Sequence, residues 1–91
     1  MNRILPIGSV VMLEGATKPV MIFGYLQQSS IYPGKIVDYV GVPYPEGNLD
    51  VTMQYGFMMD DIAEIIFEGY RSKDFEPWAK LLEIKALGDN K

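Results

Sequence analysis

The sequence predicts an α+β fold, in which a small antiparallel β-barrel or roll of SH3-like type is followed by one C-terminal helix. Residues 5–70 contain four to five short, β-prone apolar runs separated by Gly and Pro, which is the pattern of antiparallel strands joined by tight turns. Residues 72–87 instead carry apolar side chains at helical spacing. A chain of 91 residues holds one hydrophobic core, so we expect a single domain over residues 1–91.

The first two strands are expected to form a hairpin. Residues 9–14 include the apolar run Val-Val-Met-Leu, which is too short for a helix and rich in β-branched side chains. Gly15 suits the positive φ of a tight connection, and Pro19 is allowed at the start of a strand but not inside one. The second strand then covers residues 20–27.

The third strand is expected to be central, because residues 35–44 are mostly apolar on both of their alternating faces. Asp38 is the exception in this run. Residues 50–58 predict a fourth, weaker strand, because their apolar side chains alternate with other residues.

The segment that follows Asp60 and Asp61 fits two structures. Its run Ile-Ile-Phe is β-prone and Gly69 closes it quickly, so we expect a turn at the two aspartates and then a strand over residues 63–68. The spacing of its isoleucines also fits one face of a helix, which keeps a helix over residues 62–70 as the alternative.

A C-terminal helix is expected over residues 72–87. Asp74 and Glu76 place negative charge at its start, where that charge is favourable to the helix dipole. Pro77 is tolerated only in the first turn of a helix, and Gly88 is a typical helix stop. The apolar stripe of this helix consists of Trp78, Leu81, Leu82 and Leu87.

The composition excludes several classes of site. The chain has no cysteine and no histidine, which removes disulfides, thiolate zinc sites and the commonest general base. No glycine-rich phosphate loop precedes a helix. We therefore expect no enzymatic activity, no catalytic residues, no metal and no cofactor. The net charge is -4 and the 8 basic residues are scattered, so we expect no nucleic-acid partner.

The cellular location is expected to be cytoplasmic. No apolar run approaches the roughly 18 residues of a membrane helix, so we expect no membrane association. Residues 1–6 lack the longer apolar run and the small-residue cleavage site of a signal peptide. A cysteine-free chain without such a signal is typical of the cytoplasm.

The adjacent carboxylates Asp60 and Asp61 are the main chemical alternative. Paired acids bind divalent metals or serve acid–base chemistry, which would make this a small metal-binding or enzymatic domain. The other interpretation is a turn or cap, in which Asp60 accepts backbone N–H bonds. The turn or cap is favoured, because nothing nearby has the spacing of a calcium-binding loop.

Residues 39–47, Tyr-Val-Gly-Val-Pro-Tyr-Pro-Glu-Gly, are a candidate for partner binding. Prolines on both sides of Tyr44 favour extended backbone that projects the ring outward, and rigid exposed aromatics are good binding anchors. The alternative is a rigid loop that covers the end of the barrel. On the helix, Trp78 either covers the domain's own core or enters a partner's groove. The candidate partner-binding residues are Tyr39, Pro43, Tyr44, Pro45 and Trp78.

Four segments in this order resemble a known bacterial family. The most specific is the Tyr-Val-Gly-Val-Pro-Tyr-Pro-Glu-Gly stretch. The resemblance is to the family called domain of unknown function 4176, over about residues 4–71. The segments that carry it are Leu5 to Val11, Met21 to Gly24, Asp38 to Gly47, and Asp60 to Ile62 with Ile65 to Tyr70.

The resemblance implies a secretion context. Members are typically encoded in Gram-positive bacteria beside type VII secretion genes and large toxins with LXG domains. It implies a non-catalytic, protein-binding accessory factor that binds such a toxin before export, as a chaperone or targeting factor. The alternative is an immunity protein that neutralises a toxin domain, which an acidic chain would suit if that domain were basic. The resemblance assigns no binding residues, and the oligomeric state stays open.

Overall fold

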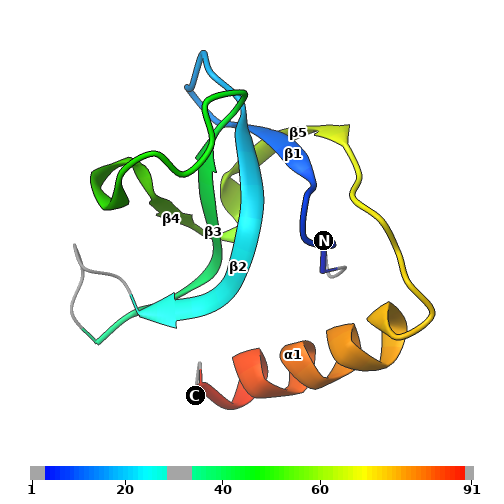
Figure 1. Ribbon diagram of the computed structural model, residues 1–91. Helices are drawn as coiled ribbons and strands as arrows, with labels where there is room; N and C mark the ends of the chain where they lie inside the picture. Colours follow the sequence, from blue (N-terminus) through cyan, green and yellow to red (C-terminus); the bar gives the residue numbers. More distant parts are fainter. Residues whose placement is uncertain (1–3, 29–33, 90–91) are drawn as a thin grey trace.

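Five antiparallel strands form one curled sheet in the order β4-β3-β2-β1-β5, and one helix follows it (Figure 1). The structure is a computed structural model that describes residues 4–28 and 34–89, without the side chains of Gln28 and residues 86–89. The elements are β1 (Val10–Leu13), β2 (Val20–Gln28), β3 (Ile36–Pro43), β4 (Tyr55–Phe57), β5 (Ile62–Phe67) and α1 (Phe75–Asp89). Two 3-10 turns, η1 (Val51–Met53) and η2 (Met59–Asp61), flank β4. The predicted α+β fold is confirmed, with an open roll because β4 and β5 lie at opposite edges of the sheet.

Register shifts in two strands curl this sheet. In β2, Phe23 is an extra residue between the pairs Ile22–Gly41 and Gly24–Val40. In β5, the pairing with β1 skips Ala63 and Ile66 in the same way. A bulge of this kind bends its strand and increases the local twist. The sheet therefore wraps around its interior instead of lying flat.

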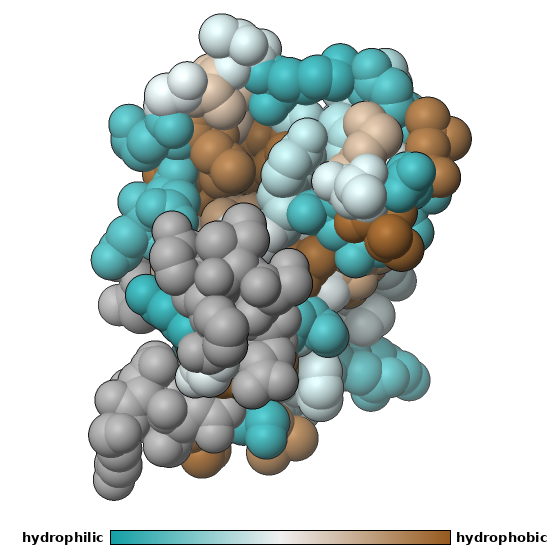
Figure 2. Space-filling model, turned by 90° about the vertical axis from the view of Figure 1, so that its left-hand side faces the viewer, coloured by the Kyte–Doolittle hydropathy of each residue, from teal (hydrophilic) through white to brown (hydrophobic). Residues whose placement is uncertain are grey.

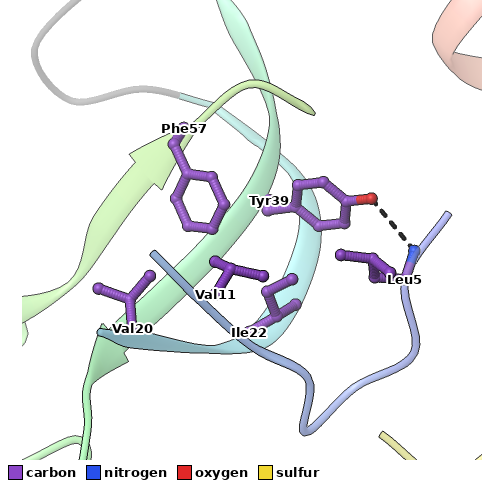
Figure 3. Packing of buried hydrophobic residues seen from close by; sticks show 6 residues of the cluster. All are labelled: Leu5, Val11, Val20, Ile22, Tyr39 and Phe57. Carbon is purple, nitrogen blue, oxygen red and sulfur yellow. Dashed lines mark hydrogen bonds between the residues drawn. The ribbon is translucent and has the colours of Figure 1, made fainter. Parts of the chain in front are cut away.

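The hydrophobic core fills the concave side of the roll. Tyr39 lies at its centre, with its ring centroid 5.6 Å from that of Phe57 and 5.9 Å from that of Tyr25. Leu5, from the segment before β1, points into this interior and its N–H donates to the hydroxyl of Tyr39 (Figure 3). The buried members of this cluster are Leu5, Val11, Val20, Ile22, Tyr39 and Phe57.

The prediction of a fourth strand over residues 50–58 is wrong in its first half. Asp50 is an N-cap, because its carboxylate accepts bonds from the N–H and the hydroxyl of Thr52 at 2.9 and 3.1 Å. This local bonding competes with extended backbone and produces η1 instead. Only Tyr55–Phe57 pair with β3. The hairpin, the central third strand and the positive φ of Gly15 are confirmed.

The turn at the aspartates and the strand after it are confirmed. The turn is η2, and the strand is β5 rather than a helix over residues 62–70. Asp38, the polar exception in the third strand, accepts a bond from the Met59 N–H at 2.7 Å. This bond ties the central strand β3 to the turn that introduces β5.

Helix α1 lies at the end of the sheet opposite the turn between β1 and β2 (Figure 1). It begins at Phe75, three residues after the predicted start at Ser72, and this later start places Pro77 in its first turn. Two sets of contacts hold the segment that connects β5 to α1. The buried hydroxyl of Ser9 accepts a bond from the Gly69 N–H at 2.9 Å, and Arg71 pairs with both Glu68 and Glu76. No helix in the described residues is long and apolar enough to cross a membrane.

Candidate protein-interaction surfaces

Two of the five predicted partner-binding residues lie inside the domain. The side chain of Tyr39 is 0% exposed, and Pro43 is also buried. The third strand is covered on both faces, so an aromatic ring within it packs in the core and offers no surface to a partner. The interpretation of Tyr39 and Pro43 as contact residues is therefore corrected.

Tyr44 and Pro45 are exposed in the loop after β3. The Tyr44 N–H donates to the carbonyl of Pro19 at 3.0 Å, and the Tyr44–Pro45 peptide is cis. The ammonium of Lys18 lies 2.9 Å from the Glu46 carboxylate and, by this hydrogen bond, holds the pKa of Glu46 below its usual value. Loop and hairpin turn are thus tied together at one end of the sheet.

Trp78 is exposed at the other end of the sheet, on α1. Because the loop after β3 and the helix lie at opposite ends (Figure 1), the five predicted residues do not form one site. On the side of the molecule that carries β4 and η1, apolar surface is interrupted by hydrophilic side chains (Figure 2). Exposed apolar residues near this loop are Leu49, Val51 and Tyr55.

Helix α1 has two apolar faces, of which one is buried. Residues three and four positions apart share a helix face, and the buried face consists of Phe75, Ala79 and Leu82. The second face is exposed by 48%, 61% and 68% at Trp78, Leu81 and Ile84, respectively. We call these three residues the α1 stripe. The predicted stripe is therefore divided between core and surface, and the Leu87 side chain lies outside the described residues.

The last strand also exposes apolar side chains. Ile65, Ile66 and Phe67 at the end of β5 are 47%, 47% and 60% exposed. Strict alternation would bury every second residue of such a strand, but the bulge at Ile66 breaks the alternation. The residue pattern contains no sign of this bulge, so these surface residues were not expected from the sequence.

The aspartate pair has a structural role through its second member. The carboxylate of Asp61 accepts a bond from the Met58 N–H at 2.9 Å, which caps η2. The cap interpretation is confirmed, although Asp61 and not Asp60 makes the bond. Within the part of the chain that the structure describes, no three acidic side chains converge to hold a metal ion.

A pair of tyrosines holds the N-terminal segment against the sheet. The hydroxyl of Tyr25 donates to the Leu5 carbonyl at 2.5 Å, and the hydroxyl of Tyr39 accepts from the Leu5 N–H at 3.1 Å. Burial, and then the neighbouring Tyr39, raise the pKa of Tyr25 to about 12. Burial likewise raises the pKa of Tyr39 above its ordinary value.

The raised pKa of Tyr25 predicts a loss of stability in alkali. In the unfolded chain this phenol ionises near pH 10, whereas in the folded chain it ionises near 12. Over that interval the unfolded chain binds fewer protons, so the free energy of unfolding falls as the pH rises. Below pH 10 the contribution is complete. Urea unfolding at a series of pH values measures this fall.

The matched control for that experiment is Tyr25→Phe. This variant starts from a lower stability, because it lacks the bond to Leu5, but it loses less with rising pH because one raised pKa is gone. Identical alkaline slopes for the variant and the parent chain would show that Tyr25 does not carry the effect.

Comparison with known proteins identifies the family. The profile of the family described as domain of unknown function (DUF4176) matches residues 4–76, which is most of the chain. The chain belongs to the DUF4176 family. The matched region contains the whole sheet, including β5, and the first two residues of α1. The searches of curated proteins and of solved structures found no match.

Proposed function

We propose that this DUF4176 protein is a cytoplasmic, non-catalytic accessory factor that binds an LXG toxin of a type VII secretion system before export, as a chaperone or targeting factor. The observation that supports protein binding is the α1 stripe. Its three large apolar side chains face solvent, although the same helix already buries Phe75, Ala79 and Leu82. The toxin as partner is an inference from the kind of genes that accompany DUF4176 members.

The physical chemistry of the α1 stripe suits a partner's groove. An amphipathic helix commonly docks through anchors spaced three and four residues apart, and tryptophan is enriched among residues that dominate binding energy. Lys80 and Lys85 lie next to the stripe on the same helix. A groove that is apolar at its centre and acidic at its rim is the complementary surface.

The test is co-purification of the intact chain with the LXG toxin encoded beside it. We expect a stable complex, and we expect Trp78→Ala with Leu81→Ala to weaken it about thirtyfold or more, since two anchors contribute about 2 kcal/mol or more. Because both side chains are exposed, thermal unfolding of the variant should change little. Glu83→Ala, on the same helix but outside the α1 stripe, is the matched control. Failure to form any complex with the toxin would refute the proposal.

Co-expression separates the targeting role from an immunity role. If the toxin domain is active inside the producing cell, an immunity protein restores growth. A targeting factor leaves growth inhibited and changes the amount of toxin that is exported. Restored growth with unchanged export would replace the proposed role by immunity.

A further inference from the structure

The two edges of the sheet differ in how well they resist pairing with another chain. At one edge β4 has only three residues, including Gly56, and such a short strand is a poor template. At the other edge β5 has six residues and pairs with β1 on one side, and no strand in the described part of the chain pairs with its other side. An exposed apolar edge strand is a template for strand addition.

The exposed side chains along η2 and β5 are acidic at first and apolar at the end of the strand. Asp60 and Asp61, in η2 directly before the strand, and Glu64, its third residue, are exposed. We call these three residues the acidic half. Ile65, Ile66 and Phe67 follow. Neither β1, η2 nor β5 contains a lysine or an arginine, so the acidic half has no basic residue within these elements.

We propose that the outer edge of β5 receives an extended segment of the partner toxin as a sixth strand. This inference rests on the proposed function and names the kind of segment that would bind. The segment carries Lys or Arg where it passes Asp60, Asp61 and Glu64, and apolar side chains where it passes residues 65–67. Main-chain hydrogen bonds supply affinity, and the alternating side chains supply specificity.

A second copy of this chain fits the same edge poorly. In an antiparallel pairing of two β5 strands about their centre, the Glu64 carboxylates of both copies would lie close together at the new junction. Like charges on adjacent strands are destabilising. The acidic half thus selects against self-pairing and in favour of a basic segment.

The experiment is amide hydrogen exchange on the intact chain, alone and in complex with the toxin. We expect the amides of β5 to exchange at least tenfold more slowly in the complex, with the amides of β4 unchanged. The double variant Asp60→Lys/Glu64→Lys and the variant Ile66→Lys should each weaken binding about tenfold or more. Tyr55→Lys at the opposite edge is the matched control. Binding should also weaken as salt is added.

The outcomes distinguish this inference from the proposed function. A complex that forms without protection of β5 overturns strand addition and leaves the toxin as partner. If the amides of β5 are protected in the chain alone and the chain has the mass of a dimer, the edge pairs with a second copy and the toxin segment is not its occupant. If no toxin complex forms, a peptide with lysines in one half and valines in the other is the remaining probe. Protection of β5 by that peptide, but not by its glutamate counterpart, supports strand addition, and no protection refutes it.

Discussion

Replacing Tyr39 by alanine is expected to lower the free energy of unfolding by about 3–5 kcal/mol, as for other large aromatic residues in cores. The ring is fully buried and packs between Tyr25 and Phe57. Its removal leaves a cavity at the centre of the roll and takes away the hydroxyl that accepts the Leu5 N–H. A domain of this size has only a small net stability, so we expect Tyr39→Ala to be largely unfolded.

The variant Tyr39→Phe separates the hydroxyl from the ring. It keeps the packing and loses only the acceptor, which leaves the Leu5 N–H buried without this partner (Figure 3). Such a loss costs about 1–3 kcal/mol. Chemical unfolding of the three chains under one condition gives both differences. If Tyr39→Phe were as stable as the parent chain, the hydroxyl would not anchor the N-terminal segment. If Tyr39→Ala were also as stable, the Tyr39 ring would not be part of the core.

Tyr39 shows which structural features can be predicted from the sequence and which cannot. The apolar alternation on both faces of the third strand correctly predicted a central strand. The same observation already implied that an aromatic ring within that strand would be buried. The prediction of Tyr39 as a contact residue rests on its place in the same segment, residues 39–47, as the proline-flanked Tyr44, which does lie at the surface. A residue that lies near an exposed residue in the sequence is not thereby exposed itself.

The exposure of the last residues of β5 is not predictable from the sequence, for a different reason. Side-chain alternation predicts which face a residue occupies only while each residue opposes one partner. The extra residues Ala63 and Ile66 break that rule, and the position of a bulge depends on the neighbouring strand. On α1 the periodicity was visible, but a helix that is apolar over two faces does not reveal which of them the sheet will cover. The division between Leu82 and Leu81 is decided by tertiary packing.

Replacing Gly69 by alanine is expected to destabilise the domain by about 3 kcal/mol, the upper part of the usual range for overpacking. An added Cβ would lie 2.3 Å from the carbonyl oxygen of Ile7 and 3.0 Å from the nitrogen of Ser9. Both are backbone atoms, which cannot turn aside as a flexible side chain does. Relief requires that residues 7–9 move away from the connection after β5, which would also strain the bond between Gly69 and Ser9.

Gly24→Ala is the matched control, because its added Cβ would meet only the Cβ of Val40 at the ordinary distance of 3.8 Å. We expect this variant to differ from the parent chain by less than about 1 kcal/mol. Thermal unfolding measures both, and a loss of 3 kcal/mol corresponds to roughly 15 °C for a domain of this length. The same movement would pull Leu5 away from Tyr25 and expose that phenol. Because burial is the largest cause of its raised pKa, Gly69→Ala should also advance the alkaline ionisation of Tyr25. A Gly69→Ala chain with unchanged melting and unchanged phenol titration would show that the N-terminal segment is not held against the sheet at this point.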